Sequence, residues 1–318
     1  MEKEDQKQFG WCFIGTGMIA KHVNMFLERS INHRIISVFS RSLNNAVAFA
    51  ESTGATAYST IKEAITAKEV EGVYIATPTS THYAIAKECI LQGKHVLIEK
   101  PFTETKAEAE ELFALAKANN VYLCEAMWTW FSPVAREVKR WVETGAIGSV
   151  EKAVFKHGRH PKHPPKSENE LRNRSALMEL GVYSIAYAYN LFGMPISMTC
   201  NAKMKDGFDE SDIITMQFTN NVVVEAEITD AAILDEQLTI FGTNGHIKNP
   251  VFHYSAEAIL IKNNESTETT QGNPWYDNEF DLVAAEIRQG KTISDFVPPE
   301  STLNVMSLLD QCLEQISK

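Results

Sequence analysis

A glycine turn between an apolar segment and a helical pattern constrains the fold more than any other feature. Residues 10–14 are apolar, residues 19–29 have helical spacing, and GTGMIA joins them. The first glycine of such a turn permits a tight bend, the second admits a pyrophosphate, and the small third residue allows close helix packing. A turn that binds nothing is the alternative, but its position between strand and helix predicts that the following residues contact a dinucleotide: Gly15, Thr16, Gly17, Met18 and Ile19.

The first 125 residues alternate strand-like and helical patterns. This alternation is typical of an α/β fold, a doubly wound parallel sheet with helices on both faces (a Rossmann fold). The expected strands are 10–14, 34–39, 70–76, 95–98 and 121–124. The expected helices are 19–29, 43–51, 81–92 and 105–118.

The remainder of the chain has a different pattern. After helices at 133–144 and 176–192, the strand-like segments 196–203, 213–219, 222–229, 237–241 and 258–261 follow without helices between them. Asn220-Asn221 is expected to form a hairpin turn. We therefore predict domains at 1–125 and 126–318, the second an α+β domain with a largely antiparallel open sheet. Helices return at 279–289 and 300–316, and the last of them can pack on the first domain.

Composition excludes several classes of protein. The 318 residues are 44% hydrophobic and 22% charged, as in a globular chain, and the net charge of −11 disfavours nucleic acid and anionic membranes as partners. Five scattered cysteines show no zinc-binding spacing and predict reduced thiols in a cytoplasmic protein. The longest near-apolar stretch, 180–196, contains three tyrosines and predicts a buried helix, not a membrane span.

The residues after the second expected strand bear on the choice of cofactor. An acidic residue about 20 positions after the glycine turn would bind the ribose of NAD. Here Ser40-Arg41-Ser42 stands at that place. Arg41 can bind a 2′-phosphate and Ser40 can donate a hydrogen bond to it, whereas no carboxylate repels it. NADP(H) is therefore expected over NAD(H), with a solvated loop arginine as the alternative.

Several motifs together resemble the Gfo/Idh/MocA oxidoreductase family. They are the glycine turn, Ala76-Thr77-Pro78-Thr79 with His82, Glu99-Lys100-Pro101 at a strand end, and Glu125-Ala126 with Trp128. Within that family, residues 181–183 and 241–245 resemble the branch that contains dimeric dihydrodiol dehydrogenase, NADP-dependent D-xylose dehydrogenase and glucose–fructose oxidoreductase. The resemblance implies an enzyme that transfers hydride between a nicotinamide cofactor and a small hydroxyl or carbonyl substrate, of the sugar, polyol, trans-dihydrodiol or dicarbonyl class.

The resemblance also implies roles for residues of the first domain. Ala76, Thr77, Pro78 and His82 would lie near the nicotinamide ribose, although His82 can equally be a packing residue. Glu99 would bind the ribose or orient Lys100, and Lys100 would assist catalysis. Pro101 is a candidate for a cis peptide bond.

The proposed acid–base residue is Tyr183, because 179–183 resembles the family's Asp-x-x-x-His/Tyr motif. Glu179 replaces the aspartate and is expected on the same helix face as Tyr183, near substrate. A nearby ammonium is needed because a free tyrosine titrates near pH 10. Trp128 and Phe155 are candidate walls of the substrate pocket, with an interdomain core as the alternative for both. Arginines 172 and 174 replace a glycine-rich approach and favour an anionic substrate.

Other possibilities remain open. A non-catalytic dinucleotide-binding sensor of the same superfamily is the main alternative, and redox-assisted epimerisation or glycoside cleavage is another. His157, His160 and His163 lie among prolines and basic residues, which predicts a basic loop and no metal. The resemblance implies a homodimer formed through the second sheet.

Overall fold

The computed structural model describes residues 7–160, 175–263, 265–273 and 276–317. The chain divides into two compact units, residues 1–127 with 275–302, and residues 128–274 with 303–318. Residues 275–302, which the sequence analysis places in the second domain, therefore cluster with the first unit. Each unit is described separately below.

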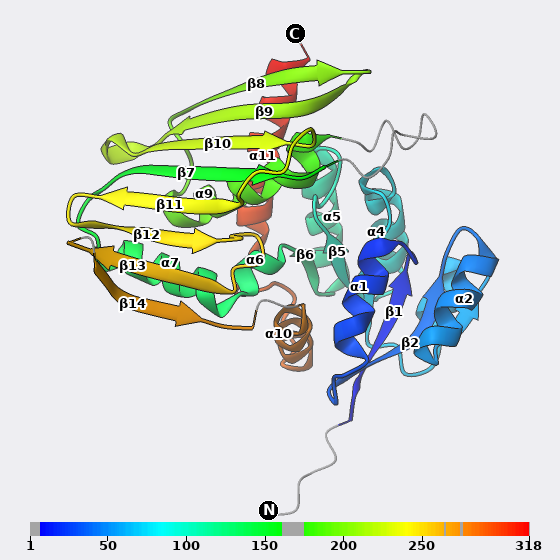
Figure 1. Cartoon of the computed structure of the whole chain (residues 1–318). Helices are drawn as coiled ribbons and strands as arrows, with labels where there is room; N and C mark the ends of the chain where they lie inside the picture. Colours follow the sequence, from blue (N-terminus) through cyan, green and yellow to red (C-terminus); the bar gives the residue numbers. More distant parts are fainter. Residues whose placement is uncertain (1–6, 161–174, 264, 274–275, 318) are drawn as a thin grey trace, which may run out of the picture. The chain divides into compact units, whose positions relative to one another are not determined.

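The first unit contains a parallel sheet of six strands in the order β3-β2-β1-β4-β5-β6 (Figure 1). The strands are β1 (Phe9–Ile14), β2 (His33–Phe39), β3 (Thr56–Tyr58), β4 (Gly72–Ile75), β5 (His95–Glu99) and β6 (Leu123–Ala126). The helices between them are α1 (Met18–Leu27), α2 (Leu43–Thr53), α3 (Ile61–Thr66), α4 (His82–Leu91) and α5 (Lys106–Asn119). This order reverses direction between β1 and β4, where doubly wound sheets bind ligands.

Helix α10 (Asp277–Arg288) joins the first unit through aromatic packing. The ring of Phe280 lies 4.9 Å from that of Trp11 and 5.1 Å from that of Tyr74. Burial of aromatic rings supplies a large apolar contribution, so a segment late in the sequence completes the core of this unit.

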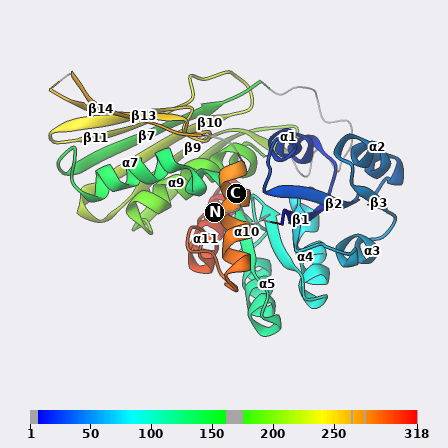
Figure 2. The same cartoon turned by 90° about the horizontal axis from the view of Figure 1, so that it is seen from below.

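The second unit contains an eight-stranded sheet in the order β14-β13-β12-β11-β7-β10-β9-β8. The strands are β7 (Val150–Gly158), β8 (Ser197–Lys205), β9 (Phe208–Gln217), β10 (Val223–Thr229), β11 (Gln237–Gly242), β12 (Gly245–Pro250), β13 (Glu257–Lys262) and β14 (Glu265–Gln271). All neighbouring pairs are antiparallel except β7 and β10, which are parallel. Helices α7 (Pro133–Glu143) and α9 (Val182–Phe192) lie against one face of this sheet (Figure 2). The final helix, α11, spans Pro299–Ile316.

The structure confirms the predicted fold class, a parallel Rossmann sheet followed by a largely antiparallel one. The predicted turn between β9 and β10 is also present: Asn220 and Asn221 both have positive φ, in a short loop that a 2.8 Å hydrogen bond from the N–H of Phe218 to the carbonyl of Val222 closes. The short strands β3, β12 and β14 were not predicted. Polar residues dominate β12 and β14, so neither shows the alternation that identifies a half-buried strand.

The helix predicted at 176–192 differs from expectation at its beginning. Leu177–Gly181 forms a π-helical turn, and regular α-helix follows from Val182. Such turns are rare and are frequently found at functional sites. In the described residues no helix is long and apolar enough to cross a membrane. All five cysteines are buried and free.

Candidate active site

The glycine turn has the tight geometry that the sequence predicts. Gly15 has a φ of +105°, and a Cβ on it would lie 2.4 Å from the carbonyl oxygen of Ala76. Its N–H donates to the carbonyl of Phe39 at 2.9 Å, and the N–H of Ala76 donates to Ile14 at 2.9 Å. Only glycine fits at this position, which brings the carboxyl ends of β1, β2 and β4 together.

The space around Gly17 is empty, whereas that around Gly15 is filled. A Cβ on Gly17 would meet no atom within 4 Å, and Gly17, the N-cap residue of α1, has no side chain that could bind the first N–H groups of the helix. Thr16 and Ile19 are half-buried and Met18 is 62% exposed. Backbone N–H groups at a helix N-terminus can bind a phosphate, and the open space at Gly17 admits one, so the residues present fit a dinucleotide.

The segment predicted to select the cofactor follows β2 directly. Ser40 is half-buried, whereas Arg41 and Ser42 are exposed. Among the described residues Arg41 forms no ion pair. Its guanidinium is therefore available for an anion at the end of the strand beside the glycine turn.

His82 joins the loops after β4 and β5 through hydrogen bonds of its ring nitrogens. It is 1% exposed, with Nε2 lying 2.8 Å from the carbonyl oxygen of Thr77 and Nδ1 lying 3.1 Å from that of Pro101. Burial lowers the pKa of His82, which favours the neutral ring. The side chain of Thr81 further bonds the hydroxyl of Thr77 and the carbonyl of Pro78. The position is structural, and contact of His82 with a cofactor stays a prediction.

Glu99 and Lys100 lie at the carboxyl end of β5. Glu99 is buried, and its Oε1 accepts a 2.5 Å hydrogen bond from the hydroxyl of Tyr74 while Oε2 accepts the backbone N–H of Lys100 at 3.2 Å. Burial raises the pKa of Glu99. Lys100 is half-buried, and the Lys100–Pro101 peptide bond is cis.

Two further buried carboxyls of the first unit were missed as site candidates. Glu125, at the end of β6, is 2% exposed and accepts a 2.9 Å hydrogen bond from the hydroxyl of Thr302. Burial raises its pKa to about 7. Glu279 on α10 is 1% exposed, and burial, together with the charges of Glu99 and Glu125, raises its pKa. Sequence alone could not show that these carboxyls are buried.

In the second unit Tyr183 lies in the first turn of α9, directly after the π-helical turn. It is 7% exposed, and its hydroxyl oxygen accepts a 3.1 Å hydrogen bond from Nε1 of Trp128. Trp128, in α6 (Trp128–Phe131), is 6% exposed. An N–H donor stabilises negative charge on the oxygen that it contacts. The structure thus brings together two residues that the sequence predicted separately.

A cluster that the sequence did not bring together adjoins Tyr183. The ring centroid of His253 lies 5.3 Å from that of Tyr183, and His157 lies 6.1 Å from the same ring. Glu236 accepts a 2.5 Å hydrogen bond involving Nδ1 of His253. Burial opposes ionisation of Glu236, but the hydrogen bond from His253 and the charges of both histidines hold its pKa below the usual range. His157, which the sequence analysis placed in a basic loop, is instead buried on β7. The three residues lie on separate segments, so no local sequence motif predicts the cluster.

The sequence analysis placed Glu179 and Phe155 near the substrate, but the structure gives them other neighbours. Arg159 forms ion pairs with Glu179 and with Asp230, the latter at 2.8 Å. Phe155 has no exposed surface, and its ring packs 5.0 Å from Phe252, so it belongs to the core of the unit. Substrate contact by either residue stays a prediction. His163 and arginines 172 and 174 lie outside the described residues.

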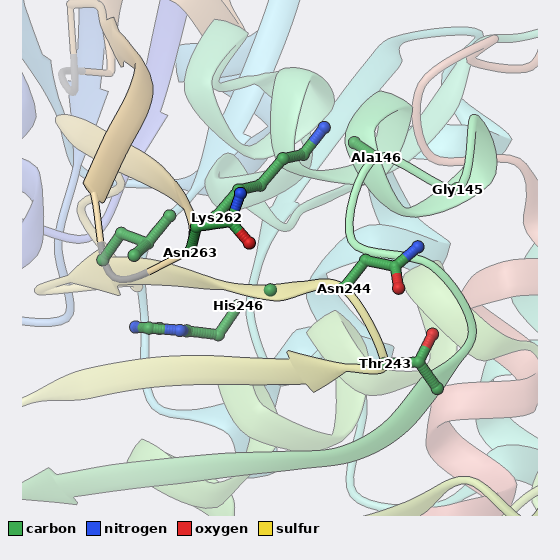
Figure 3. A pocket seen from close by; sticks show the side chains of 9 residues that line it. Gly145, Ala146, Thr243, Asn244, His246, Lys262 and Asn263 are labelled. Carbon is green, nitrogen blue, oxygen red and sulfur yellow. The ribbon is translucent and has the colours of Figure 1, made fainter.

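A separate hollow of about 610 Å³ in the second unit lies at the β11–β12 hairpin. Its lining residues include Thr243, Asn244, His246 and Lys262 (Figure 3). None of the site residues predicted from the sequence lines it. The hollow is bordered by polar groups of a hairpin and is distinct from the surroundings of Tyr183.

Known protein families match both parts of the sequence. The family model described as an oxidoreductase family with an NAD-binding Rossmann fold matches residues 9–126, and the GFO/IDH/MocA C-terminal domain matches residues 135–248. Trans-1,2-dihydrobenzene-1,2-diol dehydrogenase of Xenopus laevis is 26% identical over 96% of this chain and 97% of its own. The human enzyme of the same name is 26% identical over 97% and 96%.

Solved structures show the same fold. A 3-ketoreductase of Actinomadura kijaniata in complex with NADP superposes with a TM-score of 0.84 at 19% identity, covering 98% of each chain. The aldose–aldose oxidoreductase of Caulobacter crescentus, solved with glycerol, gives 0.87 at 19% identity and the same coverage. The two family models together match most of the sequence, and the chain therefore belongs to the GFO/IDH/MocA oxidoreductase family.

Proposed function

We propose that this protein is an NADP(H)-dependent dehydrogenase or reductase acting on a CH–OH group or the corresponding carbonyl of a small molecule. The observation that carries the proposal is the glycine turn, where Gly15 permits the tight bend and Gly17, the N-cap residue of α1, leaves open space. Membership of an oxidoreductase family supports the redox class. Full-length similarity to dihydrodiol dehydrogenases supports a sugar, polyol, trans-dihydrodiol or dicarbonyl substrate.

The preference for NADP(H) rests on the residues after β2. Arg41 is exposed and forms no ion pair in the described part of the chain, and Ser40 and Ser42 add hydroxyl donors. A guanidinium binds a phosphate through two parallel hydrogen bonds, and a carboxylate that would repel the 2′-phosphate is missing from Ser40-Arg41-Ser42. The 3-ketoreductase that shares the fold was solved with NADP.

For catalysis we assign Tyr183 as the general acid–base and Lys100 as the charge that stabilises its phenolate. A bound nicotinamide would supply or accept the hydride. In the oxidative direction Tyr183 removes the proton of the substrate hydroxyl, and in the reductive direction it returns a proton to the carbonyl oxygen. The indole N–H of Trp128 supports negative charge on the phenol oxygen.

Residues around the cofactor would orient it. Thr77 and Pro78 lie on the loop that His82 holds. The carboxylate of Glu99 accepts the backbone N–H of Lys100 and so fixes the start of the loop after β5. Contact of Ala76, Thr77, Pro78 and Glu99 with the nicotinamide ribose follows from the family resemblance. Substrate would contact Trp128 and Tyr183, and Glu179 would bond a hydroxyl of the substrate.

A homodimer through the second sheet is part of the proposal. Helices α7 and α9 cover one face of the sheet (Figure 2). Ile213 on β9 and Phe241 on β11 follow buried neighbours that face these helices, so both point to the other face, where they are exposed. An antiparallel sheet commonly leaves one face for a partner or for solvent. Light scattering of the purified protein should give twice 35.6 kDa, and a particle of 35.6 kDa would contradict the dimer. The cytoplasmic location expected from the sequence stays a prediction.

A cofactor-consumption screen tests the proposed function. Purified protein would be assayed with NADPH or NADP⁺ against sugars, polyols, trans-dihydrodiols and dicarbonyls, with Tyr183→Phe as the matched control. Turnover that depends on Tyr183 supports the enzyme. Stoichiometric NADPH binding with no turnover on any of these compounds would favour the sensor instead.

A further inference from the structure

We propose that His157, Glu236 and His253 form a binding site for one divalent transition-metal ion, with Zn²⁺ as the best-suited ion. The inference goes beyond the proposed redox function, which uses no metal, and does not depend on it. Two imidazoles and one carboxylate are the ligand set of many three-residue zinc sites. Within the described residues these side chains come from three separate segments of the second unit.

The fold holds the three ligands in a fixed arrangement. Strands β7 and β11 pair with Lys156 opposite Gln237, so His157 and Glu236 are adjacent across the ladder. The backbone N–H of Val251 donates to the carbonyl of Glu236 at 3.0 Å, and the N–H of His253 donates to its Oε1 at 3.0 Å. The segment after β12 is thereby fixed beside β7, which keeps His253 next to Glu236.

The ligand atoms have nearly the spacing that one ion needs. One nitrogen of each histidine and a carboxylate oxygen of Glu236 all lie within 4.8 Å of one another. Nε2 of His157 lies 3.7 Å from Oε2 of Glu236, and Nδ1 of His253 lies 2.5 Å from Oε1. Metal–ligand distances of about 2.0–2.2 Å place tetrahedral ligand atoms about 3.3 Å apart. Shifts of roughly 1 Å, achieved by rotating side chains, would meet that requirement.

The two imidazole rings are compatible with a shared ion. Their centroids lie 4.6 Å apart with an angle of 25° between the ring planes. Two rings bound to one ion through nitrogen at the tetrahedral angle have centroids about 5 Å apart, given nitrogen–zinc distances of about 2.0 Å, so a small shift of either ring meets this geometry. Binding at Nδ1 of His253 would replace the proton that the ring now shares with Glu236.

The surroundings favour a strongly held ion. His157 is 5% exposed, and the side chains of Glu236 and His253 are 12% and 16% exposed. Aromatic rings enclose the cluster, with Phe252 5.7 Å from His157 and Trp128 and Tyr254 5.8 and 4.2 Å from His253. An apolar shell restricts water and strengthens the attraction between ion and carboxylate. The remaining exposure of Glu236 and His253 leaves a path for entry.

The test measures Zn²⁺ binding directly, without any substrate. Untagged protein, dialysed against a chelator and then freed of it, would be titrated with ZnCl₂ by calorimetry, and Co²⁺ would be followed by its visible absorption. We expect one ion per chain with a micromolar or lower Kd, and a Co²⁺ spectrum typical of nitrogen–oxygen coordination. His157→Ala, His253→Ala and Glu236→Gln should each weaken binding at least about tenfold.

Matched controls keep the result interpretable. His160→Ala, at the exposed position two residues after β7, and His246→Ala, on β12, should leave the affinity unchanged. Glu236→Gln keeps the size of the side chain, and its circular dichroism and Tm should show that the fold is retained. Absence of stoichiometric binding by the unsubstituted protein, or binding that survives all three ligand substitutions, would overturn the site. Neither outcome bears on cofactor turnover, which the screen above measures separately.

Discussion

The indole Nε1 of Trp128 donates a hydrogen bond of 3.1 Å to the phenol oxygen of Tyr183. Both side chains are less than 10% exposed, so little water competes for this bond. The donor favours the form of the tyrosine that carries negative charge on oxygen. Trp128 therefore polarises the group to which we assign acid–base chemistry.

Replacing Tyr183 by phenylalanine should reduce turnover about 10²–10⁴-fold, because general acid–base catalysis contributes that much. NADPH affinity, measured by fluorescence titration, should stay nearly unchanged. Tyr187→Phe is the matched control, since Tyr187 lies one turn later in α9 and bonds Asn249 in the core at 3.1 Å. Retained turnover in Tyr183→Phe would remove the residue from its assigned role.

Trp128→Phe keeps an aromatic ring but removes the N–H donor to Tyr183. A hydrogen bond to a charged group is worth about 1.5–3 kcal/mol, so we expect kcat to fall roughly 10- to 100-fold and its pH profile to move to higher pH. Trp130→Phe is the control, because Trp130 is equally buried and its ring stacks on Tyr189. A pH profile that does not move would show that the indole only fills space.

The two glycines of the turn should respond differently to alanine. Gly15→Ala places a Cβ 2.4 Å from the carbonyl oxygen of Ala76 at positive φ, so folding stability should fall by at least about 2 kcal/mol. The Cβ of Gly17→Ala meets no protein atom within 4 Å, so this variant should keep the Tm. It should weaken NADPH binding about tenfold or more, because the methyl group would occupy the proposed phosphate-binding site. Denaturant unfolding and cofactor titration of both variants check this contrast.

Arg41→Ala should weaken NADPH binding by roughly 10- to 100-fold, the equivalent of losing a charged hydrogen bond of about 1.5–3 kcal/mol. NADH affinity should change little, since NADH has no 2′-phosphate. Titrating the unsubstituted protein with both cofactors supplies the reference values. Tighter binding of NADH than of NADPH there would refute the cofactor preference directly.

Glu125 should make stability depend on pH. Its pKa is raised by burial from 4.5 in the unfolded chain to about 7 in the folded protein. The folded state therefore retains a proton that the unfolded chain releases, and its stability declines as pH rises from about 4.5 to 7, by up to about 3 kcal/mol.

Glutamine at position 125 cannot ionise, so Glu125→Gln should flatten the decline of stability with pH. The same substitution at the exposed Glu51 should not. Urea unfolding at a series of pH values measures the difference. Parallel pH dependence in Glu125→Gln and the unsubstituted protein would show that the carboxyl ionises without cost.

The sequence alone determined the features that depend on local pattern. The strand–glycine–helix turn, the alternation of strands and helices, and the hairpin at Asn220-Asn221 each follow from the conformational preferences of neighbouring residues. The location of Lys100 at a strand end follows in the same way, because parallel strands of such a sheet end at a common edge.

Only the tertiary structure decided which distant residues meet and which carboxyls are buried. His157, Glu236 and His253 come together because β7 pairs with β11 and the segment after β12 folds back on Glu236. Glu279 is buried because α10 packs into the first unit through Phe280, and Glu125 is buried at the end of β6, where the hydroxyl of Thr302 bonds it. Such contacts depend on strand order and burial, which local periodicity does not encode, so neither the ligand cluster nor the raised pKa values could be inferred from the chain by itself.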